Sequence, residues 1–260
     1  MILVFSGTGN SMYVAQSLSR ILGERVVTYP AVIQANDNER IIWCFPVYSW
    51  GVPPVVIRWI DACRSALTAS GDHYAVMTCG DDAGLTARQW RRLIGAKAHG
   101  AFTVIMPNIY VLMRGFDTDP AEVEAAKIAA AEPRIADIAR AIEAGFRGDD
   151  VTRGRFAFIK SKIIYPGFVS HAMSPKPFHP TDGCVGCGIC SRTCPLHNIS
   201  MKDHRPCWGD NCAQCLRCYH ICPHHAVAYG KATRGKGRYT AMLHLVNGSE
   251  SNTKTNKGSV

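Results

Sequence analysis

The sequence lacks the features that would place the protein in a membrane or outside the cell. No apolar run in its 260 residues approaches the roughly 18–20 residues that cross a bilayer. Residues 1–5 have neither the basic n-region nor the long apolar h-region of a secretory signal peptide. We therefore predict a cytoplasmic protein without a membrane span. In a reducing cytoplasm the 12 cysteines are expected to be free for metal binding rather than paired in disulfides.

The sequence also lacks the motifs of several enzyme classes. No Ser/His/Asp or Cys/His arrangement indicates a nucleophile, so we predict no catalytic residue of that kind. No separate nicotinamide-binding domain is visible. The glycine-rich segment near the start has no Gly-Lys-Ser/Thr ending, which excludes a Walker loop, and Met12 stands where a dinucleotide fingerprint has its third glycine.

Two copies of one cysteine phrase are the most informative feature that is present. Both copies have the spacing C-x2-C-x2-C-x3-C-P, which is that of bacterial ferredoxins with two [4Fe–4S] clusters. Structural zinc usually takes its four ligands as two pairs, so zinc is the weaker interpretation. Because such clusters carry single electrons, the phrase indicates electron transfer. The cysteines are Cys184, Cys187, Cys190 and Cys194 in the first run, and Cys212, Cys215, Cys218 and Cys222 in the second.

The other cysteines and the nearby histidines are not expected to bind metal. Free cysteines on core elements are usually small buried hydrophobic groups, and this is our prediction for Cys44, Cys63 and Cys79. Cys207 lies outside both runs and is predicted to be unligated. The histidines that follow the two runs are interpreted as surface groups or as neighbours of the ligands; they are His197, His224 and His225.

Charge is distributed unevenly along the chain. Residues 1–150 contain 14 Lys+Arg and 16 Asp+Glu, a net charge of −2, whereas residues 151–240 contain 13 and 3, a net charge of +10. A basic segment usually indicates nucleic acid or an acidic partner. Two iron–sulfur sites would each add a net charge of roughly −2, because a core of about +2 is bound by four thiolates, and the formal count omits this charge. We therefore do not predict nucleic-acid binding.

Strand-like and helix-like stretches alternate over residues 1–145. Helical spacing of apolar residues predicts helices, and short apolar runs that end at glycine, serine or proline predict buried parallel strands. The alternation of five predicted strands with four predicted helices indicates an α/β fold, in which a doubly wound parallel sheet has helices on both faces. The predicted strands are 2–5, 25–29, 41–45, 74–78 and 102–106, and the predicted helices are 12–22, 55–67, 86–98 and 121–144.

The rest of the chain divides into three parts. Residues 146–180 are rich in Gly, Pro and basic residues, and we interpret them as a connector that packs on both domains, in preference to a membrane-surface element. Residues 181–232 hold the cysteine repeat. Residues 233–260 form a C-terminal extension that we predict to be partly disordered, because residues 247–260 are rich in Ser, Asn, Thr, Lys and Gly.

A loop rich in small and hydroxyl residues follows the first predicted strand and opens a helix. Its backbone N–H groups and the positive end of the helix favour a phosphate. The hydroxyl-rich form suits one phosphate monoester better than a bridging pyrophosphate, which indicates FMN. A tight strand–helix turn or another anion is the alternative. The loop residues are Ser6, Gly7, Thr8, Gly9, Asn10 and Ser11.

Two further loops are predicted to reach the same ligand, because ligands of doubly wound sheets lie at the carboxyl ends of the strands. Tyr48 and Trp50 offer flat faces to an isoalloxazine ring, or they simply pack at a strand end. Asp81 and Asp82 either lie near the flavin or cap a solvated loop. The predicted residues are Pro46, Val47, Tyr48, Ser49, Trp50 and Gly51 after the third strand, and Cys79, Gly80, Asp81, Asp82 and Gly84 after the fourth.

These motifs resemble known families. Residues 1–145 look like a flavodoxin and residues 181–232 look like a bacterial two-cluster ferredoxin, so the chain resembles the flavodoxin–ferredoxin fusion proteins. The phrases at 5–11 and 45–48 are typical of that group. The resemblance implies a flavodoxin-like sheet of five strands in the order 2-1-3-4-5, and a small α+β dicluster ferredoxin-like domain.

The resemblance also implies the cofactors, which are FMN in the first domain and two [4Fe–4S] clusters in the second. In the two-cluster pattern, the fourth cysteine of each run binds the cluster of the other run. Cluster one would then use Cys184, Cys187, Cys190 and Cys222, and cluster two would use Cys212, Cys215, Cys218 and Cys194.

Two redox functions follow from these predictions. The first is an electron-transfer iron–sulfur flavoprotein that passes electrons between FMN and two [4Fe–4S] clusters and on to redox partner proteins. The alternative is an FMN-dependent reductase of a small molecule, such as a quinone, a nitro compound or another unsaturated compound, refilled through its clusters. A non-redox module that binds nucleic acid or lipid through the basic connector and tail is the weakest hypothesis.

Overall fold

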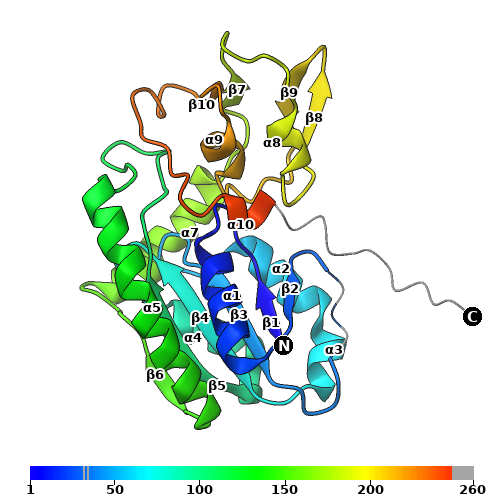
Figure 1. The fold of residues 1–260 in the computed structure, drawn as a ribbon, viewed down its shortest axis with the longest axis vertical. Helices are drawn as coiled ribbons and strands as arrows, with labels where there is room; N and C mark the ends of the chain where they lie inside the picture. Colours follow the sequence, from blue (N-terminus) through cyan, green and yellow to red (C-terminus); the bar gives the residue numbers. More distant parts are fainter. Residues whose placement is uncertain (32, 34, 248–260) are drawn as a thin grey trace, which may run out of the picture.

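Six parallel strands form the central sheet of the computed structural model, which describes residues 1–31, 33 and 35–247 (Figure 1). Their order is β2-β1-β3-β4-β5-β6. The α/β fold with a parallel sheet, predicted from the alternation of apolar patterns, is confirmed. The strands are β1 Ile2–Val4, β2 Val26–Thr28, β3 Ile41–Pro46, β4 His73–Cys79, β5 Ala98–Ile105 and β6 Gly148–Asp150.

The sheet has one strand more than the five predicted. β6 lies in the predicted connector and pairs in parallel with β5, so the sheet extends past the expected boundary at residue 145. Its three residues have no apolar pattern that could have identified them as a strand. The Arg91 guanidinium holds β6 in place, because it donates hydrogen bonds to the Gly148 carbonyl at 2.6 Å and to the Asp149 carboxylate at 2.8 Å.

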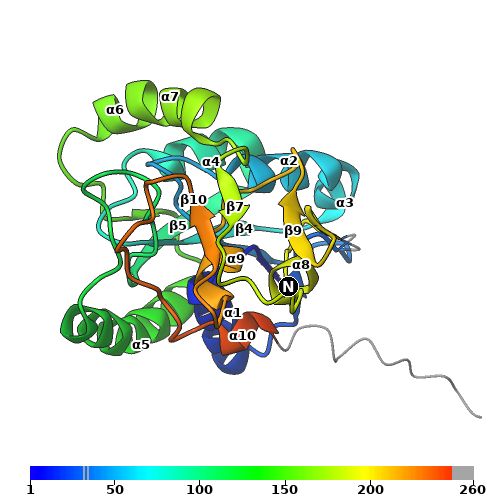
Figure 2. The ribbon, with the colours of Figure 1, turned by 90° about the horizontal axis from the view of Figure 1, so that it is seen from above.

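Helices cover both faces of the sheet (Figure 2). α1 Asn10–Leu22 and α5 Ala121–Glu143 pack on one face, where Val4, Leu18 and Ile138 belong to one apolar core. α2 Pro54–Ala62, α3 Arg64–Ala69 and α4 Thr86–Ile94 lie on the other face, where Trp43 and Trp90 belong to a second core. The helix predicted over 55–67 is thus divided at Cys63, and the helix predicted over 86–98 ends at Ile94 before a 3-10 turn, η1 Gly95–Lys97.

The cysteine-rich region, residues 178–229, lies over the carboxyl ends of the strands (Figure 1). It has two antiparallel pairs, β7 with β10 and β8 with β9. Equivalent residues of the two cysteine runs share left-handed backbone conformations, namely Gly186 with Gln214, Gly188 with Leu216, and His197 with His225. The duplication therefore extends from the cysteines to the backbone. The elements are β7 Phe178–Pro180, α8 Ile189–Arg192, β8 Ile199–Lys202, β9 Arg205–Trp208, α9 Arg217–Ile221 and β10 Val227–Tyr229.

Two other segments join the regions. The connector contains one continuous run of α- and π-helical turns over residues 157–172, the connector helix, which lies on the side of α2 and α4 (Figure 2). The C-terminal extension, predicted to be partly disordered, is packed as far as α10 His244–Asn247, since Leu243 and Val246 belong to the core beneath α1. Residues 248–260 lie outside the described residues. No helix in the described ranges is long and apolar enough to cross a membrane.

Candidate functional site

The predicted phosphate loop connects β1 to α1 at the carboxyl edge of the sheet. The Gly9 N–H donates a hydrogen bond to Ser6 Oγ at 3.1 Å, which closes the loop on itself. Gly9 adopts φ 103°, and a Cβ there would lie 1.9 Å from the Met242 carbonyl oxygen. A Cβ on Gly7 would lie 2.4 Å from the Cys215 carbonyl oxygen. The two glycines therefore allow the C-terminal extension and the cysteine-rich region to pack directly on this loop.

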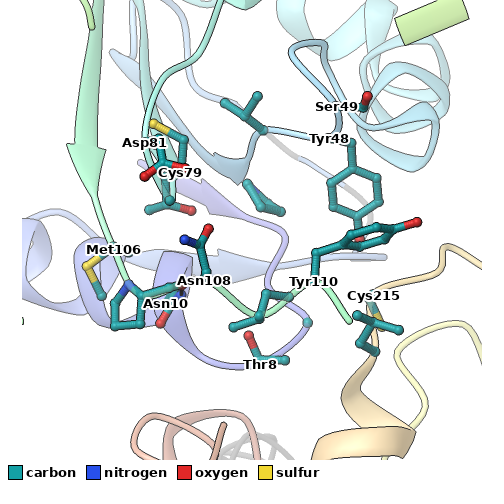
Figure 3. A pocket seen from close by; sticks show the side chains of 18 of the residues that line it. Thr8, Asn10, Tyr48, Ser49, Cys79, Asp81, Met106, Asn108, Tyr110 and Cys215 are labelled. Carbon is teal, nitrogen blue, oxygen red and sulfur yellow. Dashed lines mark hydrogen bonds between the residues drawn. The ribbon is translucent and has the colours of Figure 1, made fainter. Parts of the chain in front are cut away.

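A cavity of about 310 Å³ lies beside the loop (Figure 3). This volume is at the lower end of the range of small-molecule and cofactor sites. The loops after β1, β3, β4 and β5 line the cavity, as expected for the carboxyl edge of a parallel sheet. The predicted residues in its wall are Ser6, Gly7, Thr8, Asn10, Ser11, Pro46, Val47, Tyr48, Ser49, Trp50, Cys79, Gly80, Asp81 and Asp82.

Three glycines predicted to contact the ligand do not line the cavity. Gly9 packs against the C-terminal extension, as described above. A Cβ on Gly51 would overlap the Tyr165 ring at 2.3 Å, and a Cβ on Gly84 would lie 2.6 Å from Ser161 Oγ. These two glycines admit the connector helix rather than a ligand, which sequence patterns alone did not indicate.

A tight turn presents the two predicted aromatic residues. Tyr48 and Gly51 exchange backbone hydrogen bonds of 3.0 and 2.9 Å across Ser49 and Trp50, which have φ values of 44° and 64°. Such left-handed conformations are uncommon outside glycine and concentrate at functional sites. Ser161 Oγ donates to the Trp50 carbonyl at 2.8 Å, so the connector helix stabilises the turn. In Figure 3, Tyr48 lies on the same side of the cavity as Cys215.

Two polar residues of the loop are engaged in structural hydrogen bonds. The Asn10 amide donates to the Pro107 carbonyl at 3.0 Å and accepts from the Tyr239 hydroxyl at 2.5 Å. Ser11 Oγ shares a 2.7 Å hydrogen bond with Thr78 Oγ1. Thr8 is buried in the cavity wall, and its hydroxyl has no hydrogen-bond partner in the described part of the chain. Thr8 is therefore the loop hydroxyl that is most available to a ligand.

The two predicted carboxylates differ. Asp82 Oδ2 accepts a 2.6 Å hydrogen bond from Lys160 Nζ, which also lies 4.9 Å from the centre of the Trp50 ring. Asp81 is exposed and lies 4.0 Å from Lys127. The Asp82 charge is thus neutralised by an ion pair, so this part of the wall is less negative than the sequence suggests.

The cavity wall contains residues that sequence reasoning did not identify. The loop after β5 follows the same carboxyl-edge rule as the others, so its position could have been anticipated. Asn108 in this loop is oriented by Asp119, which accepts hydrogen bonds from its N–H and its amide at 2.9 and 3.0 Å. Cys215 was predicted as a cluster ligand but not as part of this wall, and no local signal marks the other lining residues of the connector and of the cysteine-rich region. The additional residues are Thr78, Met106, Pro107, Asn108, Ile109, Tyr110, Met113, Phe116, Lys160, Phe168, Gln214, Cys215 and Leu216.

The cysteines of the two runs form two sets of neighbouring thiols. Burial, together with the nearby thiols of Cys222, Cys184 and Cys187, raises the pKa of Cys190 to about 11. Burial and the nearby thiols of Cys215 and Cys194 raise the pKa of Cys212 to about 12, and the pKa of Cys218 is raised in the same way by burial, Cys215, Cys212 and Cys194. Each set takes three thiols from one run and the fourth from the other, which is the grouping that the resemblance implies. Cluster binding itself stays a prediction.

Backbone amides donate to sulfur atoms in both sets. The Asn198 N–H donates to Cys194 Sγ at 3.4 Å, and the Ala226 N–H donates to Cys222 Sγ at 3.3 Å in the equivalent position of the second copy. The Gln214 N–H donates to Cys212 Sγ at 3.3 Å. Hydrogen bonds of this kind stabilise the charged form of a thiol.

Arg217 connects the second thiol set to the phosphate loop. Its buried guanidinium donates to the carbonyls of Gly7 at 2.7 Å, Ser6 at 2.6 Å and Thr193 at 2.8 Å. Burial lowers its pKa, and the nearby Cys215 and Cys194 act in the opposite direction. Ile189 stands at the equivalent position of the first copy, so this connection belongs to the second copy alone.

The remaining candidate residues lie where the sequence predicts. Cys44, Cys63 and Cys79 are buried in the sheet region, and the three histidines that follow the runs are exposed. Within the described residues, no group of three or more His, Cys, Asp or Glu side chains is arranged to hold a metal ion. A [4Fe–4S] cluster differs from a single ion in this respect, because each of its four cysteines binds a different iron.

Comparisons with known proteins give little further information. No protein-family model matches the chain, and no curated protein matches it. The solved structure of the Trp repressor binding protein from Bacillus subtilis is similar to this chain, with 13% sequence identity and a TM-score of 0.33. The match covers 52% of this chain and 96% of that one. A similarity this weak supports no conclusion about function.

Proposed function

We propose that this protein is an electron-transfer iron–sulfur flavoprotein similar to the flavodoxin–ferredoxin fusion proteins. FMN would occupy the cavity, and a [4Fe–4S] cluster would bind each thiol set. The observation that carries the proposal is that Cys215, a member of the second thiol set, lines the same cavity as the phosphate loop. A flavin and a cluster would therefore be neighbours within one chain.

The cavity has the chemistry that FMN requires. Gly7, Thr8 and the start of α1 provide small residues, a hydroxyl group and the positive end of a helix for the phosphate. Tyr48 and Tyr110 provide aromatic surface beside Cys215 (Figure 3). FMN, when bound, exchanges two electrons and releases them singly.

The two thiol sets suit different positions in a transfer route. The second set adjoins the cavity, and Arg217 fixes it to the phosphate loop. The first set lies farther out, where Cys187 and the neighbouring Val185 are exposed. We assign the second set to exchange with the flavin and the first set to exchange with redox partner proteins.

The experiment is anaerobic purification followed by reconstitution with iron, sulfide and FMN. We expect about eight iron atoms and one flavin per chain. Iron near zero, or no retained flavin after reconstitution, would contradict the proposal. The loaded protein is then titrated in two separate experiments. Absorbance monitors the flavin in one, and electron paramagnetic resonance monitors the clusters in the other.

A variant pair tests the assigned order. Cys187→Ser should slow reduction by an external one-electron protein donor, while exchange between the flavin and the second cluster persists. Cys215→Ser should abolish that internal exchange. Fast turnover of a quinone or nitro compound by the loaded protein would instead favour the alternative, an FMN-dependent reductase refilled through its clusters.

A further inference from the structure

The connector helix, residues 157–172, follows Phe156 and is fixed to the sheet region by its inner face. The Tyr165 hydroxyl donates to the Val52 carbonyl at 2.6 Å, and Ser161 Oγ accepts from the Leu85 N–H at 2.8 Å. Lys160 pairs with Asp82 on the same side. These contacts determine which face of the helix remains outside.

The outer face of the connector helix is apolar. Phe156, Phe158 and Ile163 are exposed to 66%, 64% and 64%, and Ile159 and Ile164 are exposed as well. In the rest of the described chain, large exposed apolar side chains occur singly, as at Ile21, Val123 and Met201, or as the pair Met113 and Phe116. Five such side chains within residues 156–164 form a contiguous patch, which marks an interaction surface.

The charged residues of the segment that carries this patch are all basic. Residues 151–181 contain no Asp or Glu, but they contain Arg153, Arg155, Lys160, Lys162 and Lys176. Arg153 and Lys160 pair with acidic residues of the sheet region. Lys162 and Lys176 have no ion-pair partner among the described residues, so they are available to negative charge outside the molecule.

We propose that the outer face of the connector helix docks on a membrane surface that carries anionic lipids. Phenylalanine and isoleucine side chains on a helix, together with lysine and arginine, are the composition of segments that lie in the bilayer interface. Nearby lysines and arginines add attraction to anionic headgroups. The segment lies on the bilayer and does not cross it, in agreement with the absence of a spanning helix in the described ranges.

Docking would also orient the cavity. The connector helix contributes Lys160 and Phe168 to the cavity wall, so this wall is held close to the docked face. If the cavity exchanges electrons as proposed above, membrane-bound redox partners would have access to it. The docking itself does not depend on that function.

Sedimentation of the full chain with lipid vesicles tests the proposal. We expect binding to vesicles of phosphatidylglycerol and phosphatidylcholine, weaker binding at high salt, and little binding to phosphatidylcholine alone. The double variant Phe158→Glu/Ile163→Glu should bind the anionic vesicles more than about tenfold more weakly, because it places charge in the patch. Far-UV circular dichroism of the variant checks that it folds.

The control is the double variant Ile21→Glu/Val123→Glu, which alters exposed apolar residues of α1 and α5, on the face of the sheet away from the connector helix. It should bind the vesicles as the unaltered protein does. The proposal would be overturned if both double variants lost vesicle binding equally. It would also be overturned if the unaltered protein did not sediment with anionic vesicles. It would also be overturned by a dimer in solution that Phe158→Glu/Ile163→Glu dissociates, since a second copy would then cover the face.

Discussion

The sheet region, residues 1–150, and the cysteine-rich region, residues 178–229, are stabilised differently. Most of the forty buried residues in the two cores on either side of the sheet come from the sheet region. The core to which the cysteine-rich region contributes has nine buried residues among those described, and two of them are Cys190 and Cys218. The hydrophobic free energy of folding grows with the apolar area that is removed from water. The sheet region, with its two cores, therefore has its own driving force for folding. We therefore expect the cysteine-rich region to depend for its stability on the clusters proposed for its thiols.

The largest expected effect is that of removing iron. Protein prepared without iron should retain the sheet, while amides of residues 178–229 lose protection against hydrogen exchange by more than about a hundredfold. Four neighbouring thiols without a cluster leave polar, partly buried groups unpaired. Hydrogen exchange followed by mass spectrometry measures both regions in one sample. Unchanged protection of residues 178–229 would show that the difference between the regions does not arise from cluster binding.

The second effect concerns the guanidinium that joins the regions. Arg217→Gln should lower the free energy of unfolding of the loaded protein by about 2–4 kcal/mol, because the carbonyls of Ser6, Gly7 and Thr193 lose a buried donor. The flavin should also bind more weakly. Chemical denaturation and a flavin titration measure the two changes.

Arg192→Gln is the matched control for Arg217→Gln. Arg192 lies in the first copy, is exposed, and donates to the Cys187 carbonyl at 2.9 Å. Its replacement should cost less than about 1 kcal/mol. Equal losses in the two variants would mean that Arg217 does not connect the regions more strongly than a surface residue does.

The third effect tests the sheet region alone through pH. Burial lowers the pKa of His73 to about 4, and the neutral ring accepts from Trp43 Nε1 at 3.2 Å and shares a hydrogen bond with Ser70 Oγ at 2.7 Å. The folded pKa lies below the unfolded value of about 6.5, so the unfolded chain takes up the proton first as pH falls. The sheet should therefore lose about 2–3 kcal/mol of stability between pH 6.5 and pH 4.

Urea denaturation at pH 7 and pH 4.5 measures the contribution of His73. The variant His73→Gln cannot titrate, so its stability should fall less over this interval than that of the unaltered protein. Parallel pH profiles of the two proteins would refute the assignment.

The smallest effect tests the close contact between the regions. Gly7→Ala adds a Cβ that would lie 2.4 Å from the Cys215 carbonyl oxygen, so the two backbones must separate. We expect a loss of about 1–2 kcal/mol in the loaded protein. Gly167→Ala is the control, because a Cβ there meets no atom within 4 Å. If both variants have the stability of the unaltered protein, the contact at Gly7 is not tight.

Sequence patterns predicted the elements that have a local period. Ile41–Pro46 and His73–Cys79 are apolar runs buried in the sheet, and each was predicted within two residues at either end. β6 was missed because Gly148, Asp149 and Asp150 have no apolar residue and depend on Arg91 for their position. The helical character of residues 157–172 was also missed, since its apolar residues face outward and its glycine and proline resemble loop composition.

By itself, the sequence determined the α/β alternation, the duplicated cysteine spacing and the hydroxyl-rich loop, since each is encoded by residues close together in the chain. Only the tertiary structure decided that the second thiol set, and not the first, lies against that loop. Arg217 and Gly7 are 210 positions apart and meet through a single hydrogen bond. Such a contact depends on how the two regions pack. Packing is set by shape and burial over the whole molecule, and neither leaves a periodic signal in the sequence.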